Sequence, residues 1–430
     1  MSKGSLRLVI TALNENGYGV GQKAGQTLTV ARTAPGDQVL VGPPKTTERW
    51  SSADLLQVVS PGPDRIVSPC RAFTEGCGGC QWLHLTYSAQ ISWKQKNLAE
   101  LLRTRAGYRG PIEPLVRMEK PEAYRNKLSL KNAGGRLVFV PEFDAGTLAP
   151  AECLVQTRAL QTAWAALRGL KVPPALEQLH LRSNLLGAVG LHAFVKALDP
   201  ATETALKSLF AALPGAVGLG ATTRQGYRLV SGEAALAQTL PDVTASPTWL
   251  IPHNGFFQTN AAQAGVLLDL VRREARLAKT DRLLDLYCGA GFFGLALASS
   301  AREVVGLEEN PQSVAAATNS AAHSGVTNAR FLVGDLGAVL ASLEGAGGEV
   351  SPREVAVVDP PREGLLPRAL DALVARAPKR LVYVSCHAPS LARDYKVLAK
   401  AGYRGVNCTP IDMFPHTSHL ETVMTMEKSR

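Results

Sequence analysis

The stretch "RLLDLYCGAGFFG", from Arg282 to Gly294, decides the fold class of this 430-residue chain. Its first half is a short apolar run typical of a buried strand. The run leads into a turn in which Gly289, Gly291 and Gly294 satisfy the pattern G-x-G-x-x-G. Glycines at such a turn let a ligand approach the backbone, and an acid about twenty residues later, here Glu308, accepts from ribose hydroxyls. The motif predicts a site for a nucleotide-like ligand.

Strand-like and helix-like stretches alternate around this motif. The strands are expected in "RLLDLY", "EVVGLE", "ARFLVG", "VAVVDP" and "RLVYVSC", with helical patterns between them. This alternation is typical of a doubly wound parallel sheet, so we expect a Rossmann-like α/β domain over residues 251–430.

Four acids are expected at the strand ends, where ligands of such sheets bind. They are Asp285, Glu308, Asp335 and Asp359, and together they would ring one crevice. A carboxylate-rich rim suits a cationic sulfonium better than an anionic pyrophosphate. The pattern therefore favours S-adenosyl-L-methionine over a dinucleotide.

A thiol and a carboxylate complete the predicted site. Cys386 follows the strand "RLVYVS", and Glu421 begins the final strand "ETVMTM". A thiolate that adds to carbon 6 of a pyrimidine makes carbon 5 nucleophilic, and a base must then remove the carbon 5 proton. These two residues indicate methylation at carbon 5 of a pyrimidine.

Two other classes of function remain open at this point. A nicotinamide-dependent oxidoreductase would use the glycine loop but would leave Cys386 and Glu421 without a role. A non-catalytic RNA-binding factor with a zinc module would explain an N-terminal barrel and the net positive charge of the chain but not the C-terminal motifs.

The rest of the chain divides into two further predicted domains. Residues 1–62 alternate in short runs separated by glycine and proline, as in a small OB-type β-barrel. Residues 63–250 begin with a helical pattern, "SAQISWKQKNLAELLRTRAGY", expected to be basic on its outer face. A mixed α/β pattern follows, with strands expected in "YRNKLSLK", "GRLVFVPEF", "LHLRSN" and "GAVGLHAFV" and an amphipathic helix in "CLVQTRALQTAWAALRGL".

Composition indicates a soluble, cytoplasmic protein without a membrane span or signal peptide. The formal net charge of +10 favours a polyanionic partner. Cys70, Cys77 and Cys80 cluster in a chain with only seven cysteines, which in a reducing compartment favours a metal site over disulfides.

At these motifs the chain resembles the RNA uracil-5-methyltransferases. The resemblance rests on "FFQTN", "DLYCGAGFFG", "GLEENP", "DPPREG", "YVSCH" and "HLET", in the family's order. It implies that Cys386 is the nucleophile and Glu421 the base. It further implies contacts to the cofactor or the pyrimidine from Gln258, Tyr287, Glu308, Asp335 and Asp359.

Three residues qualify the resemblance. Arg362 replaces the aromatic residue that base amino-methyltransferases carry after Pro-Pro, which argues against an adenine or cytosine amine as acceptor. Phe292 and His387 stand where the family often has a polar residue and an asparagine, respectively.

The front of the chain resembles the branch that acts on 23S ribosomal RNA. That branch has a TRAM-type barrel and a four-cysteine [4Fe–4S] cluster, which implies Cys70, Cys77, Cys80 and Cys153 as ligands. Four thiolates also suit zinc. The resemblance favours 23S rRNA over tRNA as substrate and implies a monomer. As a hypothesis, a basic strand with Arg125, Lys127 and Lys131 offers contacts to phosphates. Trp82 and His84 are candidates for stacking on unpaired bases, with core packing as the alternative for Trp82.

Overall fold

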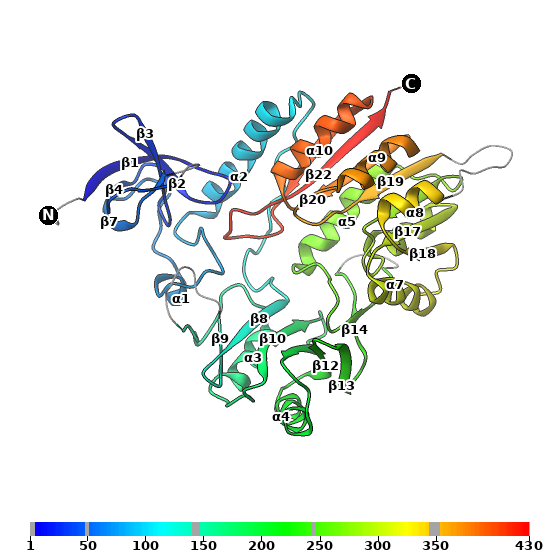
Figure 1. Cartoon of the computed structure of the whole chain (residues 1–430). Helices are drawn as coiled ribbons and strands as arrows, with labels where there is room; N and C mark the ends of the chain where they lie inside the picture. Colours follow the sequence, from blue (N-terminus) through cyan, green and yellow to red (C-terminus); the bar gives the residue numbers. More distant parts are fainter. Residues whose placement is uncertain (1–4, 48–50, 140–146, 242–245, 344–352, 430) are drawn as a thin grey trace.

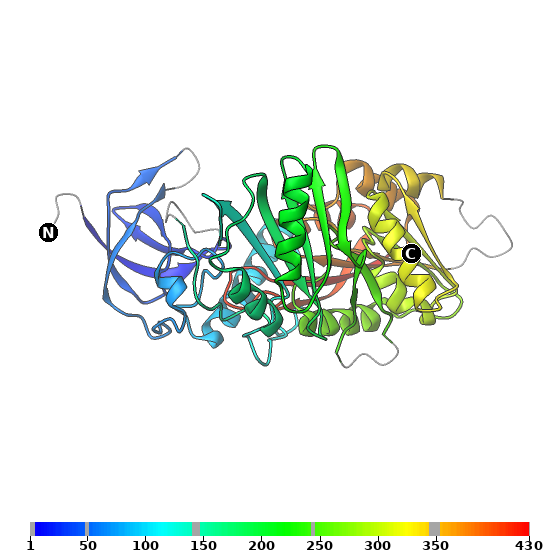
Figure 2. The ribbon, with the colours of Figure 1, turned by 90° about the horizontal axis from the view of Figure 1, so that it is seen from below.

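The computed structural model describes residues 5–47, 51–139, 147–241, 246–343 and 353–429. Three large sheets follow one another along the chain (Figure 1). Seen from below, the N-terminal sheet lies at one end of the molecule and the last sheet at the other, with the second sheet between them (Figure 2).

The first sheet is curled, seven-stranded and mainly antiparallel, in the order β5-β6-β3-β2-β1-β4-β7. In β1, alternate residues such as Leu8 and Ile10 point inward, as the period of two predicts. The predicted runs of alternation all contain strands. The strands are β1 (Leu6–Leu13), β2 (Gly19–Lys23), β3 (Gln26–Val30), β4 (Gln38–Val41), β5 (Lys45–Thr46), β6 (Ser51–Ser52) and β7 (Leu55–Ser60).

The segment that carries the clustered cysteines, residues 70–80, which we call the cysteine segment, leads from this sheet into a long helix. A one-turn helix, α1 (Arg71–Thr74), follows Cys70, and α2 (Tyr87–Leu101) continues into a π-helical turn at Leu102–Ala106. The Thr86 side chain caps α2 by accepting from the Ala89 N–H. The expectation that the basic residues of α2 face outward is wrong for Lys94, which is fully buried.

The second sheet has six strands, in the order β13-β12-β11-β10-β8-β9. Helices α3 and α4 pack on one of its faces over a core of leucine, valine and alanine side chains. Its elements are β8 (Lys127–Ala133), β9 (Arg136–Val138), α3 (Arg158–Leu167), β10 (Leu176–Ser183), β11 (Val189–Val195), α4 (Pro200–Ala211), β12 (Ala216–Thr223) and β13 (Gly226–Gly232). Part of the predicted strand "GRLVFVPEF" falls outside the described residues.

A two-stranded hairpin and a helix connect this sheet to the last one. The hairpin pairs β14 (Ala235–Gln238) with β15 (Trp249–Pro252), and α5 (Ala261–Ala275) follows. The Asn260 side chain caps α5 by accepting from the Gln263 N–H.

The third sheet has the order β18-β17-β16-β19-β20-β22-β21. All five predicted parallel strands are present, and every residue of β16 is buried because helices cover both faces. The strands are β16 (Arg282–Leu286), β17 (Glu303–Glu308), β18 (Ala329–Val333), β19 (Glu354–Val358), β20 (Arg380–Ser385), β21 (Tyr403–Ile411) and β22 (Glu421–Lys428). The α-helices are α6 (Phe292–Leu297), α7 (Pro311–His323), α8 (Leu336–Ser342), α9 (Pro367–Arg376) and α10 (Ala388–Lys400), and a short 3₁₀ turn, Ala298–Ser300, follows α6.

The order of this sheet confirms the predicted Rossmann-like fold. The chain starts in the middle at β16, moves outward to β18, and returns on the other side of β16 with β19 and β20. Strand β22 is antiparallel and lies between β20 and β21. The carboxyl ends of β16, β17, β19 and β20 therefore share one edge with the amino end of β22.

Candidate functional site

A cavity of about 1250 Å³ opens at this edge of the third sheet. It extends to the second sheet and to the cysteine segment, so its wall is built from parts of the chain that are far apart in sequence. The ionisable, thiol and amide residues used below that line it are Cys70, Cys77, Cys80, Arg125, Lys127, Cys153, Gln258, Tyr287, Glu308, Asp359, Arg362, Cys386, His419 and Glu421.

Cys386 and Glu421 lie opposite each other at the end of a strand pair. Ser385, the last residue of β20, pairs with Thr422 of the antiparallel β22. The next residue of β20 and the preceding residue of β22 are Cys386 and Glu421, so both reach the same point of the cavity. The sequence motifs are thus brought together by the reversal of the last strand.

The surroundings of the Cys386 thiol favour its protonated form. Burial raises its pKa to about 12, and the carboxylates of Glu421 and Asp359 add to this, while Arg362 opposes them. Its nucleophilicity therefore depends on the loss of the thiol proton.

Glu421 is buried, and its pKa is raised well above the usual range, first by burial and then by Asp359. Its Oε1 atom has no hydrogen-bond partner among the described residues. A buried carboxyl oxygen that faces a cavity without a partner is suited to accept a bond from a ligand.

The glycine loop forms the floor of the cavity. Gly291 adopts a φ of +80° at the start of α6, and Tyr287 adopts a φ of +63° just after β16. Glu308, at the end of β17, accepts from the Gly289 N–H (3.2 Å) and the Asn310 N–H (2.9 Å). Its carboxylate is therefore fixed beside the loop, where an acid that binds ribose hydroxyls is expected.

The four predicted acids do not share one position. Glu308 and Asp359 line the cavity, whereas Asp285 is fully buried beneath it and accepts from the Gly294 N–H at 2.7 Å. Asp335 caps α8 by accepting from the Ala338 N–H and is not among the residues that line the cavity. The expected four-acid rim is wrong in this respect, because the Asp285 carboxylate holds the start of the helix instead.

Gln258 lines the cavity on the side of the second sheet. Its carbonyl accepts from the Asn126 side chain at 3.0 Å. Arg182 of β10 donates to the neighbouring carbonyls of Phe257 and Gly255, both at 2.9 Å. The segment that carries Gln258 is thus attached to the second sheet.

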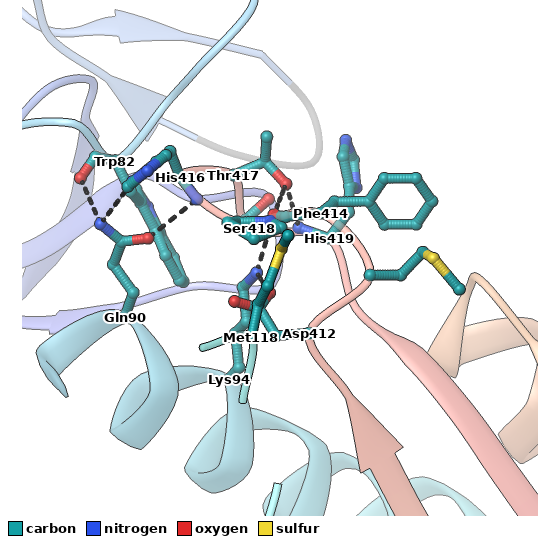
Figure 3. A network of polar contacts seen from close by, with 12 residues as sticks. Trp82, Gln90, Lys94, Met118, Asp412, Phe414, His416, Thr417, Ser418 and His419 are labelled. Carbon is teal, nitrogen blue, oxygen red and sulfur yellow. Dashed lines mark hydrogen bonds and ion pairs between the residues drawn. The ribbon is translucent and has the colours of Figure 1, made fainter. Parts of the chain in front are cut away.

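The loop between β21 and β22, residues 412–420, is held by α2 and the segment before it (Figure 3). The backbone N–H of Trp82 donates to the His416 carbonyl, and the Gln90 side chain accepts from the backbone N–H of His416, both at 2.9 Å. Ser418 N–H donates to the Gln81 side chain at 3.1 Å. These contacts fix the loop that leads directly into Glu421.

A fully buried ion pair anchors the start of this loop. Lys94 Nζ lies 2.5 Å from Asp412 Oδ1 and donates to the Phe414 carbonyl at 3.0 Å (Figure 3). Tyr87 donates its hydroxyl proton to Asp412 Oδ2 at 2.7 Å. Burial lowers the pKa of Lys94, and Asp412 opposes that shift. This pair could not be predicted from the sequence, because a lysine in an amphipathic helix normally faces water.

His419 is a further cavity residue to which the sequence analysis assigned no role. Burial lowers its pKa to about 4, and the nearby Arg362 acts in the same direction. The ring is therefore neutral near pH 7 and lies two residues before Glu421. Its position within "SHLET" was the available signal.

The four predicted cysteine ligands converge on another wall of the cavity. Cys80 is buried, and burial together with the neighbouring Cys153 and Cys77 raises its pKa. Cys70 and Cys153 pack against the same apolar cluster as Cys80. Within the described residues, no group of three or more His, Cys, Asp or Glu side chains is arranged to hold a single metal ion.

The hypothesis that Trp82 and His84 stack on RNA bases is wrong. Their exposed fractions are 1% and 2%, and the Trp82 indole donates to the Gly17 carbonyl of the first sheet at 2.9 Å. Both rings therefore belong to the contact between the cysteine segment and its neighbours.

Among the described residues, no helix has the length and apolar character needed to cross a lipid bilayer.

Comparisons with known proteins agree with this architecture. The family described as tRNA (Uracil-5-)-methyltransferase matches residues 194–429. An uncharacterized RNA methyltransferase of Gloeobacter violaceus is 34% identical, over 98% of this chain and 96% of its own length. One of Chlorobaculum tepidum is 30% identical, over 92% and 90%.

Among solved structures, the tRNA (uracil-54, C5)-methyltransferase of Pyrococcus abyssi, in complex with S-adenosyl-L-homocysteine, is similar over the whole chain. Its TM-score is 0.75 and its identity 27%, over 98% of this chain and 100% of that one. The family match and this structural similarity point to the same class of enzyme as the sheet order and the motifs at the cavity. The chain belongs to the tRNA (uracil-5-)-methyltransferase family of RNA-modifying enzymes.

Proposed function

We propose that this protein transfers a methyl group from S-adenosyl-L-methionine to carbon 5 of a uridine in RNA, through a covalent bond between Cys386 and carbon 6. The observation that carries the proposal is the register of β20 and β22, which sets Cys386 opposite Glu421. Both residues line the cavity that contains the glycine loop.

The residues at the loop suit the proposed cofactor. Glu308 is held where it can accept from ribose hydroxyls, and Gln258, Tyr287 and Asp359 line the same space. We assign these four residues to the cofactor or the pyrimidine, and we assign Asp335 an indirect role at the start of α8. The bound donor would supply an activated methyl group on a cationic sulfur. The complex of the Pyrococcus abyssi enzyme with S-adenosyl-L-homocysteine supports this choice.

The proposed chemistry assigns one step to each of the two catalytic residues. The Cys386 thiolate adds to carbon 6 of the uracil. The electron pair displaced to carbon 5 would form the bond to the methyl group while the methyl–sulfur bond of the donor breaks, so that S-adenosyl-L-homocysteine would be the leaving group. Glu421 then takes the proton from carbon 5, the carbon 5–carbon 6 double bond re-forms, and the thiolate leaves. A target base in folded RNA must leave its stack to enter the cavity.

The raised pKa values of Cys386 and Glu421 fit these roles. A carboxylate with a raised pKa is a stronger base once it is ionised, which favours proton removal by Glu421. Burial raises the Cys386 pKa to about 12, and a cationic cofactor nearby would oppose the further contribution of the Glu421 and Asp359 carboxylates.

Covalent trapping tests this mechanism. RNA that contains 5-fluorouridine should form a stable adduct with the intact enzyme, because fluorine cannot leave as a proton. Cys386→Ala should give neither adduct nor 5-methyluridine. Glu421→Gln should accumulate the adduct on ordinary RNA, because elimination stalls after methylation.

His387→Asn is the matched control, because it changes the neighbour of the nucleophile to the residue that the family often has. This variant should still form 5-methyluridine. An adduct that persists in Cys386→Ala would overturn the proposed nucleophile.

For the substrate, we propose a uridine of 23S rRNA, with tRNA as the second candidate. The first rests on the resemblance at the front of the chain. The second is favoured by the Pyrococcus abyssi tRNA enzyme, which is similar over 98% of this chain, its N-terminal sheet included. Mapping 5-methyluridine in both RNAs, with and without the protein, separates them.

We also propose that Cys70, Cys77, Cys80 and Cys153 hold a [4Fe–4S] cluster, with zinc as the alternative. Four thiolates are the usual ligand set of such a cluster, and the four cysteines all belong to the lining of the cavity. The cluster would brace this wall and take no part in methyl transfer. Protein purified without oxygen should contain iron and sulfide; zinc in their place would remove the cluster from the proposal.

The proposed organisation has a TRAM-like barrel over residues 1–62, an RNA-binding domain over 63–250 and the methyltransferase domain over 251–430. We propose that the protein acts as a cytoplasmic monomer.

A further inference from the structure

The two faces of the second sheet differ sharply in chemistry. On the face under α3 and α4, strands β8, β10, β11 and β12 present leucine, valine and alanine side chains. The alternate residues of the same strands point to the opposite face, because side chains alternate along a strand. On that face lie His180, His192, Phe194 and Tyr227, which we call the ring face.

The four rings form one continuous group across three strands. His180 and His192 are directly opposite in the β10–β11 register. The ring centroid of Phe194 lies 4.8 Å from that of His180 and 4.2 Å from that of His192. The ring centroid of Tyr227 lies 6.0 Å from that of His192. The opposite, helix-covered face of the same strands carries aliphatic side chains, so the rings are confined to one face of the sheet.

Both histidines are neutral near pH 7. Burial lowers the pKa of each to about 4, and the cations Lys127 and Arg182 lower that of His180 further. His180 and Phe194 are only partly buried, so their edges or faces remain accessible. Neutral, partly exposed rings can stack on a base, as aromatic side chains do on RNA-binding sheets.

The surroundings of the ring face are positively charged. Lys127 and Lys131 lie on the same face of β8 as Ser129, which pairs with His180. Arg182, two residues after His180, donates to the backbone carbonyls of Phe257 and Gly255, which carry no net charge. Its positive charge therefore adds to the potential felt by a polyanion at this face.

The ring face is continuous with the catalytic cavity. Lys127 and Ser129 line the cavity that also contains Cys386 and Glu421. A strand of RNA whose target base enters the cavity would therefore pass Lys127 and meet the rings with its neighbouring nucleotides.

We propose that the ring face is a stacking platform for unpaired bases of the same RNA that carries the target uridine. This inference rests on the proposed function and adds a second contact site, which sets how far the recognised RNA must extend beyond the modified nucleotide.

Binding and kinetics test the platform together. Phe194→Ala and His180→Ala should each raise the Kd for a fluorescein-labelled single-stranded decauridylate by about 5- to 150-fold, the range expected for the loss of one stacked base. The same variants should raise KM for a methylatable RNA transcript and leave kcat near the wild-type value. Phe194→Trp keeps a stacking surface, so its Kd for the same RNA should stay close to the wild-type value.

Charge variants provide a matched control on the same sheet. Lys131→Gln should lower the slope of log Kd against log salt by about one. Arg228→Gln should not, because Arg228 lies on the opposite face, where it pairs with Glu203 of α4. Photocrosslinking of RNA that contains 4-thiouridine should label the peptide spanning residues 178–194.

Three outcomes would overturn the platform while the proposed function stands: unchanged Kd and KM in both alanine variants, a loss of kcat alone, or no crosslink within residues 178–194. A wild-type enzyme that makes no 5-methyluridine would overturn the proposed function instead. The binding and crosslinking results would still judge the platform.

Discussion

Replacing Lys94 by methionine tests how strongly the loop of residues 412–420, which leads into Glu421, is anchored. Methionine keeps most of the apolar stem but removes the ammonium group. The loop then loses the ion pair with Asp412 and the bond to the Phe414 carbonyl, while Tyr87 remains the donor to Asp412.

The magnitude follows from the burial of the pair. Both side chains have an exposed fraction of 0%, so the variant leaves a carboxylate in the interior without its counter-charge. Removing one member of such a pair costs about 3–5 kcal/mol. We expect Lys94→Met to lower the free energy of unfolding by that amount, and to lower kcat at temperatures where it stays folded, because Glu421 follows this loop.

Urea unfolding followed by tryptophan fluorescence measures the effect. Lys96→Met on the same helix is the control, because Lys96 is exposed, and it should cost about 1 kcal/mol or less. The double variant Lys94→Met/Asp412→Asn should be more stable than Lys94→Met alone, because it removes the unpaired charge. A loss below about 1 kcal/mol in Lys94→Met, or no recovery in the double variant, would refute the reasoning.

Three further predictions concern other buried groups. Burial raises the pKa of Asp285 to about 7, so its contribution to stability is present below about pH 4 and is lost as the pH rises through 7. The free energy of unfolding of Asp285→Asn, relative to that of the wild type, should therefore rise by roughly 1.4 kcal/mol per pH unit between about pH 4 and pH 7. A difference in urea unfolding that does not depend on pH would contradict this. Because the pKa of Cys386 is raised to about 12, kcat/KM should increase with pH between pH 6.5 and 8.5; a flat profile in a methyl-transfer assay would show that the thiol proton does not limit the reaction. Trp82→Phe should cost about 1–3 kcal/mol of stability but leave the RNA Kd unchanged, and an altered Kd would mean that the indole contacts RNA.

The parallel part of the third sheet was predictable because its strands are short apolar runs between helical patterns. The hydrophobic period also located β8, β10, β11 and α3. The N-terminal strands were found because Leu8 and Ile10 alternate with exposed residues. These signals are local, and each element carries its own.

The residues that line the cavity were harder to predict from the sequence, because they come from helices and strands that contact one another only in the folded protein. Cys386 and Glu421 were both identified, but their direct opposition comes from the antiparallel pairing of β20 and β22. The burial of Lys94 depends on a partner more than 300 positions away in the chain. Asp335 resembles a rim residue in sequence, yet a helix start uses its side chain. Spacing along the chain does not encode these contacts.

The position of β22 between β20 and β21 has a consequence for synthesis on the ribosome. Residues 403–411 emerge before their neighbour in the sheet exists, and the open side of β20 stays unpaired until residues 421–428 arrive. A nascent chain stopped just before Glu421 would expose two strand edges, which are templates for aggregation. Premature termination there would yield a substrate for quality-control proteases, with neither Glu421 nor a completed sheet.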